Sequence, residues 1–172
     1  MNITELEQPD VPLWAIWALQ QYAKETSKEE CLKKYGKFIK SVMLFIEGNH
    51  HPNLELHPNG LLYADGKNKA VTWMNSTANG KPVVPRSGYI VEFNALWYNA
   101  LCFCAALCEL EGKQERLQHL LELAEKTKQS FLDTFLNEYG YLYDYVDGNM
   151  IDWSVRPNMI FPVAFDYSPL SQ

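Results

Sequence analysis

Basic clusters, long apolar runs and paired cysteines are all scarce in this chain. Its 15 Lys and Arg residues stand against 21 Asp and Glu residues, which gives a net charge of −6 at pH 7. No basic block of the kind that neutralises phosphates is present, so we expect no nucleic-acid partner. No apolar run approaches the roughly 18–20 residues that cross a bilayer, so we also expect no membrane partner.

Cysteine and histidine are too few and too irregularly spaced to predict a metal centre. No C-x-x-C pair occurs, so a structural zinc site is not expected. We predict no metal and no cofactor, and we interpret the thiols as reduced, core-filling side chains. The residues concerned are Cys31, Cys102, Cys104, Cys108, His50, His51, His57 and His119.

Several signatures of catalysis and of targeting are missing as well. The chain has no serine nucleophile elbow, no P-loop and no G-x-G-x-x-G segment. Its first ten residues, MNITELEQPD, are acidic and lack an apolar stretch, so we expect no signal peptide. Together with the unpaired cysteines, this favours a reducing, cytoplasmic location.

Apolar and aromatic side chains are plentiful, at 47% and 13% of the 172 residues, and they suffice for a packed core. Their spacing predicts helices over about 11–25, 28–47, 90–111, 113–137 and 157–166. Ser27 and Glu30 predict a capping box at the start of the second helix. From this pattern we predict an all-α fold.

The segment 49–88 differs from the rest because Pro, Gly and Asn recur between short apolar runs. We expect a long loop insert that contains one or two short β-hairpins. Loops of this length are usually functional or disordered, and Tyr63, Trp73 and Met74 favour order. The later segment YGYLYDYVDG predicts a short two-stranded turn or a loop that faces a ligand.

Aromatic rings accompany a carboxylate near the start of the first helix. Asp10 precedes Trp14, and two interpretations stay open: a helix N-terminal acid, or a carboxylate that accepts hydrogen bonds from sugar hydroxyls beside a ring. Trp73 lies in a polar loop, where rings commonly stack on ligands. Trp97 and Tyr98 lie in an apolar helix, where large aromatics are more often core.

Charged and amide side chains flank the helix that begins near residue 90. Arg86 and Glu92 are interpreted either as an ordinary ion pair or capped helix terminus, or as a buried, charge-matched pair at the mouth of a pocket. Asn94 interrupts an apolar helix and needs hydrogen-bond partners, for which sugar hydroxyls are suitable. Arg156 and Asn158 stand in the same way before the last helix. Rings, carboxylates and amides together predict a carbohydrate site.

Four segments of the chain resemble the C-terminal amylo-α-1,6-glucosidase domain of glycogen debranching enzymes. They are DVPLWAIWALQQY, NGLLYAD leading into TWMN, VVPRSGYIVEFNALWYNAL, and SVRPNMIFPVAFDYSPL. The third is the longest and most specific match. The segments occur in the order of the family and cover most of residues 9–170.

The resemblance implies part of an (α/α)6 toroid with a sugar pocket lined by loops at one end. It also implies hydrolysis of the α-1,6-linked glucose at a glycogen or α-glucan branch stub, with inversion and without a cofactor. Inversion requires a carboxylic acid and a carboxylate base about 6.5–9.5 Å apart. On these motifs we predict substrate-binding roles for Asp10, Trp14, Trp73, Arg86, Glu92, Asn94, Trp97 and Arg156.

The chain departs from the family pattern at the position of the general acid. The family motif TWMD reads TWMN here, so the expected aspartate is Asn75. An amide cannot deliver a proton, and general acid catalysis is worth about 10²–10⁴-fold. Either another acid serves, with Glu92 and Asp65 as the nearest candidates, or activity has been altered or lost.

The length of the chain also departs from the family. A toroid of twelve helices of about 11–12 residues each, with its loops, exceeds 172 residues. We therefore expect residues 1–172 to be one partial domain, completed by the rest of a parent catalytic domain that supplies the base. An apolar face left open in this way favours self-association.

Three alternatives stay open beside this function. In the first, the chain is a non-catalytic, carbohydrate-binding relative of the family. In the second, it is part of a related hydrolase that acts on another glucan or on trehalose. In the third, it is a helical interaction scaffold without a ligand.

Overall fold

The computed structural model describes residues 8–170. Residues 1–7, on which most of the signal-peptide expectation rests, lie outside the described part, as do residues 171–172. The described chain contains five α-helices and one 3-10 helix. They are α1 (Val11–Glu25), α2 (Lys28–Glu47), α3 (Val91–Leu110), α4 (Gln114–Phe135), η2 (Pro157–Met159) and α5 (Ile160–Ala164).

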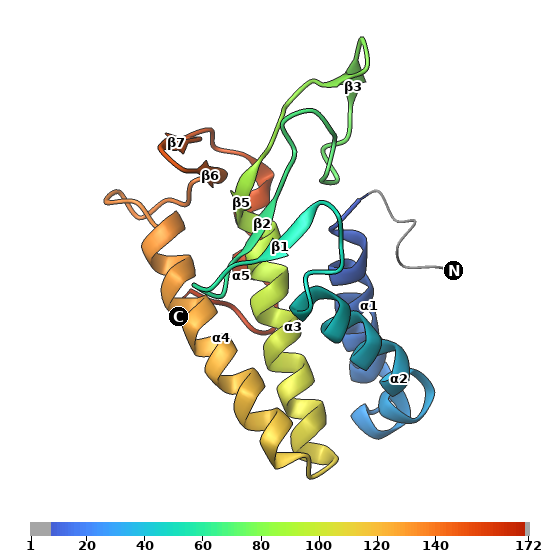
Figure 1. The fold of residues 1–172 in the computed structure, drawn as a ribbon. Coiled ribbons are helices and arrows are strands. Elements are labelled where there is room, and N and C mark those ends of the chain that lie inside the picture. The colour runs from blue at the N-terminus through green and yellow to red at the C-terminus, as the bar shows by residue number, and fades with distance from the viewer. Residues whose placement is uncertain (1–7, 171–172) are drawn as a thin grey trace.

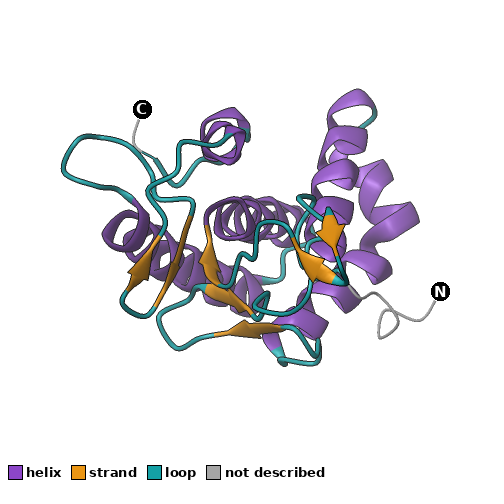
Figure 2. Ribbon diagram, turned by 90° about the horizontal axis from the view of Figure 1, so that it is seen from above, coloured by secondary structure: helices purple, strands orange, loops and turns teal. Residues whose placement is uncertain are grey.

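Helix α3 is the centre of the molecule. Helices α1 and α4 flank it, α5 packs against it, and strands cross its N-terminal half, as Figures 1 and 2 show from two directions. Its side chains are apolar nearly all round, including the fully buried Phe93, Leu96, Trp97 and Leu101. A helix that is apolar on every face has to be buried on every face.

Helix α3 corrects one expectation from the sequence. Its 20 residues have a mean hydropathy of 1.3, which is long and apolar enough to cross a membrane. The expectation that no run approaches such a length was therefore wrong. However, 83% of that apolar window is buried inside the protein, as a central core helix requires.

The helix limits agree with the sequence patterns because local caps set them. Pro12 lies in the first turn of α1, where no N–H partner is needed. The Ser27 side chain accepts a hydrogen bond from the Glu30 backbone N–H at 3.1 Å. The reciprocal half of the predicted capping box does not form, because the Glu30 carboxylate accepts from the Tyr22 hydroxyl at 2.9 Å.

The predicted all-α class is wrong, and the chain is a mixed α/β structure rather than a purely helical toroid fragment. In the described residues, five strands form one antiparallel sheet with the order β1-β2-β5-β6-β7. These are β1 (Leu54–Leu56), β2 (Leu62–Ala64), β5 (Gly88–Ile90), β6 (Tyr145–Asp147) and β7 (Met150–Ile151). A second, two-stranded sheet pairs β3 (Thr77–Ala78) with β4 (Lys81–Pro82) and projects beyond the rest (Figure 1).

The hairpins expected within 49–88 are present as β1-β2 and β3-β4. The joining of β1 and β2 to β5, β6 and β7 in one sheet escaped the sequence patterns because its strands are two or three residues long. Alternation over so few residues cannot be distinguished from a loop. Its central pairing is also remote in sequence, since Tyr89 of β5 pairs with Val146 of β6. Gly88 permits that pairing: its φ is +94°, and a Cβ there would lie 2.3 Å from the Val146 carbonyl oxygen.

Candidate functional site

Arg86 lies between two buried carboxylates where β5 leads into α3. Its Nη1 and Nη2 donate to the two carboxylate oxygens of Glu92, the Nη2 contact being 2.7 Å. Its Nε donates to Asp144 Oδ2 at 2.8 Å, and its Nη2 donates to Asp144 Oδ1 at 3.0 Å. The Arg86 side chain is 1% exposed and both carboxylates are 0% exposed. Arg86 and Glu92 thus form a buried ion pair, whereas their position beside a pocket stays a prediction.

Asp144 extends this pair into a larger polar network. Arg156 Nη1 donates to Asp144 Oδ2 at 2.7 Å, and Asn158 Nδ2 donates to Asp144 Oδ1 at 2.7 Å. The Trp73 indole N–H donates to Asn158 Oδ1 at 2.9 Å. One buried aspartate thus ties the 73 loop and the segment before η2 to the start of α3. We call Arg86, Glu92, Asp144, Arg156 and Asn158 the arginine network.

Asp144 is the central residue that the sequence analysis missed. It lies among aromatic residues in the run YLYDYVD, immediately before β6. A lone carboxylate in such a run requires a buried donor, because an unpaired buried charge is costly. The sequence therefore indicated that Asp144 needs a buried partner, but it did not indicate which cation that partner is.

The electrostatics of the network keep Arg86 cationic. Burial lowers the pKa of Arg86, but hydrogen bonds and charges from Glu92 and Asp144 outweigh burial and raise that pKa above its ordinary value. Burial also raises the pKa of Glu92, while Arg86 opposes the shift. A carboxylate held by a bidentate guanidinium is well placed to position its neighbours.

Asp10 lies beside this network but outside its hydrogen bonds. It is 3% exposed, and its Oδ1 has no hydrogen-bond partner within residues 8–170. Burial raises the pKa of Asp10 to about 6; the Trp14 side chain and the Trp73 backbone oppose the shift, and the Glu92 charge adds to it. Near neutral pH this carboxyl therefore takes up and releases a proton, and it holds unused hydrogen-bonding capacity.

Two of the predicted sugar-binding residues are committed to the fold. The Asn94 side chain accepts from the Leu62 N–H at 2.7 Å and donates to the carbonyls of Leu62 and Ile90 at 3.1 and 3.0 Å. The Trp97 indole N–H donates to the Gly60 carbonyl at 3.2 Å, and the side chain is fully buried. Both fasten β2 and its turn to α3.

The aromatic candidates near Asp10 differ in exposure. Trp73 is 45% exposed, and its indole N–H is held by the hydrogen bond to Asn158. Trp14 is half-buried and packs edge-on against Trp17 and Phe161, at ring-centroid distances of 5.8 and 5.3 Å. A partly open Trp73 ring beside a buried carboxyl is suitable for a ligand with one apolar and one hydroxylated face.

Two of the three positions considered for the general acid, Asn75 and Asp65, lie in exposed loops. Asn75 is exposed and precedes β3, whereas Asp65 is exposed and lines a polar cavity of about 370 Å³ beside β1 and β2. Glu92, the other alternative, is held by Arg86. None of the predicted sugar-binding residues lines the larger cavity of about 770 Å³ that the described chain contains elsewhere. Residues 8–170 also contain no group of three His, Cys, Asp or Glu side chains that could hold a metal ion.

Comparison with models of protein families identifies a related family. Residues 5–172 match the model of the family described as amylo-alpha-1,6-glucosidase. The match spans nearly the whole chain and includes the arginine network, Asp10 and Asn75. No curated protein matches the chain.

Proposed function

Since the chain belongs to the amylo-alpha-1,6-glucosidase family, we propose that it forms part of a domain that releases α-1,6-linked glucose from glycogen or α-glucan branch stubs. The rest of the parent catalytic domain supplies the carboxylate base. The isolated chain therefore binds the glucan without turning it over. Cytoplasmic location and self-association of the isolated chain stay predictions.

The observation that carries the proposal is the unpartnered carboxylate oxygen of Asp10, a side chain that lies near the Trp14 side chain and the Trp73 backbone. A buried acceptor without a partner is costly to the fold, so such groups are retained where a ligand satisfies them. A sugar hydroxyl supplies the missing donor, and the exposed part of Trp73 covers an apolar sugar face. Because Oδ1 is shielded from solvent, a sugar that reaches it requires a local rearrangement of the residues that cover it.

The arginine network serves this site as a rigid support. Glu92 lies close enough to Asp10 to raise its pKa, and Trp73 is fastened to Asn158. We propose that Arg86 and Glu92 position the Asp10 and Trp73 side chains and do not contact the sugar themselves.

A second candidate function is glucan binding without hydrolysis. Asn75 favours it, because an exposed amide at the acid position hydrogen-bonds the glycosidic oxygen but donates no proton. Glu92 is an unsuitable substitute while Arg86 holds both of its oxygens. The two functions differ in turnover and agree in binding.

The test compares glucose release from a phosphorylase limit dextrin by the parent protein with Asn75 intact and with Asn75→Asp. Activity of the native protein that the aspartate does not improve supports hydrolysis with another acid. Activity that appears only with Asn75→Asp supports the binding alternative. Absence of both activity and glucan binding contradicts both proposals.

Binding is measured separately, by titrating maltose or isomaltose against tryptophan fluorescence, which reports on Trp14 and Trp73. Loss of one hydrogen bond to a charged group costs about 1.5–3 kcal/mol, so we expect Asp10→Asn to weaken binding about 10- to 100-fold. Asp133→Asn, which alters an exposed aspartate on α4 outside the network, is the matched control and leaves the affinity unchanged.

A further inference from the structure

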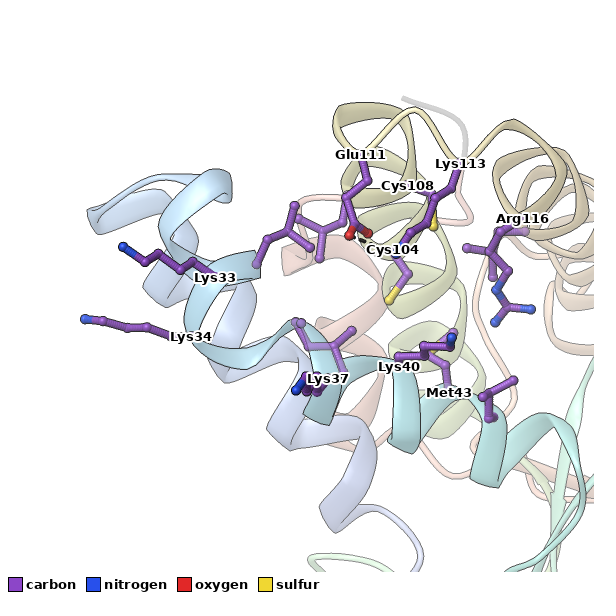
Figure 3. Close-up of a pocket in the computed structure, with 16 residues that line it drawn as sticks. Lys33, Lys34, Lys37, Lys40, Met43, Cys104, Cys108, Glu111, Lys113 and Arg116 are labelled. Atoms are coloured by element: carbon purple, nitrogen blue, oxygen red, sulfur yellow. Dashed lines mark hydrogen bonds and ion pairs between the residues drawn. The ribbon is translucent and has the colours of Figure 1, made fainter.

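The larger cavity of the described chain is a groove between α2, α3 and the start of α4. It has a volume of about 770 Å³ (Figure 3). That is within the range of about 300–1,000 Å³ in which ligand sites occur. Its floor is apolar and comes from all three helices, through Leu32, Ile39, Met43, Cys104, Leu107 and Leu120.

The two cysteines of the groove contribute to its apolar character. Cys104 and Cys108 lie on α3, across the groove from α2 (Figure 3). Burial raises the pKa of both thiols, so both stay neutral at physiological pH. A neutral thiol behaves as a small apolar group.

The edge of the groove is strongly basic although the whole chain carries a net charge of −6. On α2, Lys33, Lys37 and Lys40 recur at the spacing i, i+4, i+7, so they follow one side of the helix over about 10 Å. Lys33 extends outward at one end of this row (Figure 3). Within the described part of the chain, none of the three forms an ion pair.

The other cations of the groove already have partners. Lys113 Nζ lies 2.8 Å from Glu111, and Arg116 Nη1 donates to Glu47 at 2.8 Å. The contrast sets the row of α2 lysines apart as unneutralised charge beside an apolar floor. We name this row, Lys33, Lys37 and Lys40, the lysine row.

We propose that the groove binds an acidic amphipathic helix of a partner protein. Apolar side chains of the partner fill the floor, and carboxylates one and two turns apart face the lysine row. Helix-in-groove recognition uses anchors at this spacing, and charge complementarity directs association and selects partners. Positive charge distributed over two turns fits an extended acidic partner better than a single anionic group. The inference does not depend on the proposed hydrolase function.

The probe is a synthetic peptide with Leu at i, i+3 or i+4, and i+7 and with Glu at flanking positions. A second peptide carries Lys in place of each Glu. Binding to the full chain is followed by fluorescence anisotropy at two salt concentrations. We expect the acidic peptide to bind and the basic peptide not to bind, with an affinity that falls as salt screens the charges.

Charge reversal tests the site itself. Lys37→Glu combined with Lys40→Glu should weaken binding of the acidic peptide at least 10-fold and allow the basic peptide to bind. The matched control, Lys69→Glu combined with Lys81→Glu, changes the net charge equally at two exposed lysines outside the groove, one in a loop and one in β4. It should leave both affinities unchanged. Circular dichroism confirms that each variant is folded.

Three results would overturn the proposal. One is equal binding of the acidic and basic peptides. Another is an equal loss of acidic-peptide affinity in the groove variant (Lys37→Glu with Lys40→Glu) and in the control variant, which would show a nonspecific response to net charge. The third is a concentration-dependent dimer in sedimentation that the groove variant alone abolishes, since the occupant would then be a second copy of this chain.

Discussion

Replacing Arg86 with methionine removes the cation that two buried carboxylates share. Asp144 keeps Arg156 at 2.7 Å, so the charge left without a cation is that of Glu92, which is 0% exposed. Removing one partner of a buried ion pair costs about 3–5 kcal/mol. For a chain of this length each kcal/mol lowers the melting temperature by about 2–4 °C, so we expect a loss of roughly 6–20 °C.

Urea unfolding followed by tryptophan fluorescence measures this loss. Without Arg86, burial raises the pKa of Glu92 further, so the folded variant binds a proton that the unfolded chain releases. The loss should therefore be smaller at pH 5 than at pH 7. Arg86→Met combined with Glu92→Gln should recover part of the stability, because the amide carries no charge.

Arg116→Met is the control for this prediction. Arg116 also holds a carboxylate by two contacts, but its side chain is 31% exposed. Partly exposed pairs contribute up to about 1 kcal/mol. If Arg86→Met costs no more than Arg116→Met at pH 7, the structural importance of the arginine network is refuted.

Two further predictions concern single positions. Because the pKa of Asp10 is raised from 3.8 to about 6, the stabilisation that its proton provides is lost as pH rises between these values. The unfolding free energy of Asp10→Asn should therefore rise by up to about 3 kcal/mol relative to that of the native chain between pH 4 and pH 7. A difference between the two proteins that stays constant over this pH range would contradict this. A Cβ at Gly66 would lie 1.8 Å from the Arg86 carbonyl oxygen, so Gly66→Ala should cost about 1–3 kcal/mol or more. Gly36→Ala, whose nearest neighbour is Leu32 Cδ2 at 3.5 Å, should instead add about 0.5–1 kcal/mol to α2; equal melting temperatures for the two variants would refute the steric argument.

Elements fixed by neighbouring residues could be predicted from the sequence. Pro12 and Ser27 begin α1 and α2, and Gly48 ends α2, so the limits of these helices agree with the predicted ranges. The apolar run of α3 likewise predicted a helix close to its observed limits. Capping and periodicity act within a few residues, and a sequence displays them directly.

Elements fixed by distant residues could not be predicted. The sheet depends on pairing Tyr63 with Tyr89 and Tyr89 with Val146. Each strand is too short to show alternation, and the partner is set by the tertiary fold. Arg86 was expected to meet Glu92, six positions away, whereas its second partner, Asp144, is 58 positions away.

The candidate site was predicted in part for the same reason. Sequence patterns identified the residue types, and the structure places the Asp10 carboxyl near the Trp14 side chain and the Trp73 backbone. Whether they bind a sugar stays a prediction. The full commitment of Asn94 to backbone groups of β2 and Ile90 could not be known without the sheet.

The arginine network also bears on how the chain completes folding as it leaves the ribosome. Arg86 and Glu92 emerge well before Asp144, and β5 remains an open sheet edge until β6 arrives. An unpaired strand edge is a site of misassociation. The segment from Asp144 to β7 therefore closes the sheet and the network in one step after α4 has emerged, and a product truncated before Asp144 leaves β5 unpaired on one side and Arg86 without its second carboxylate.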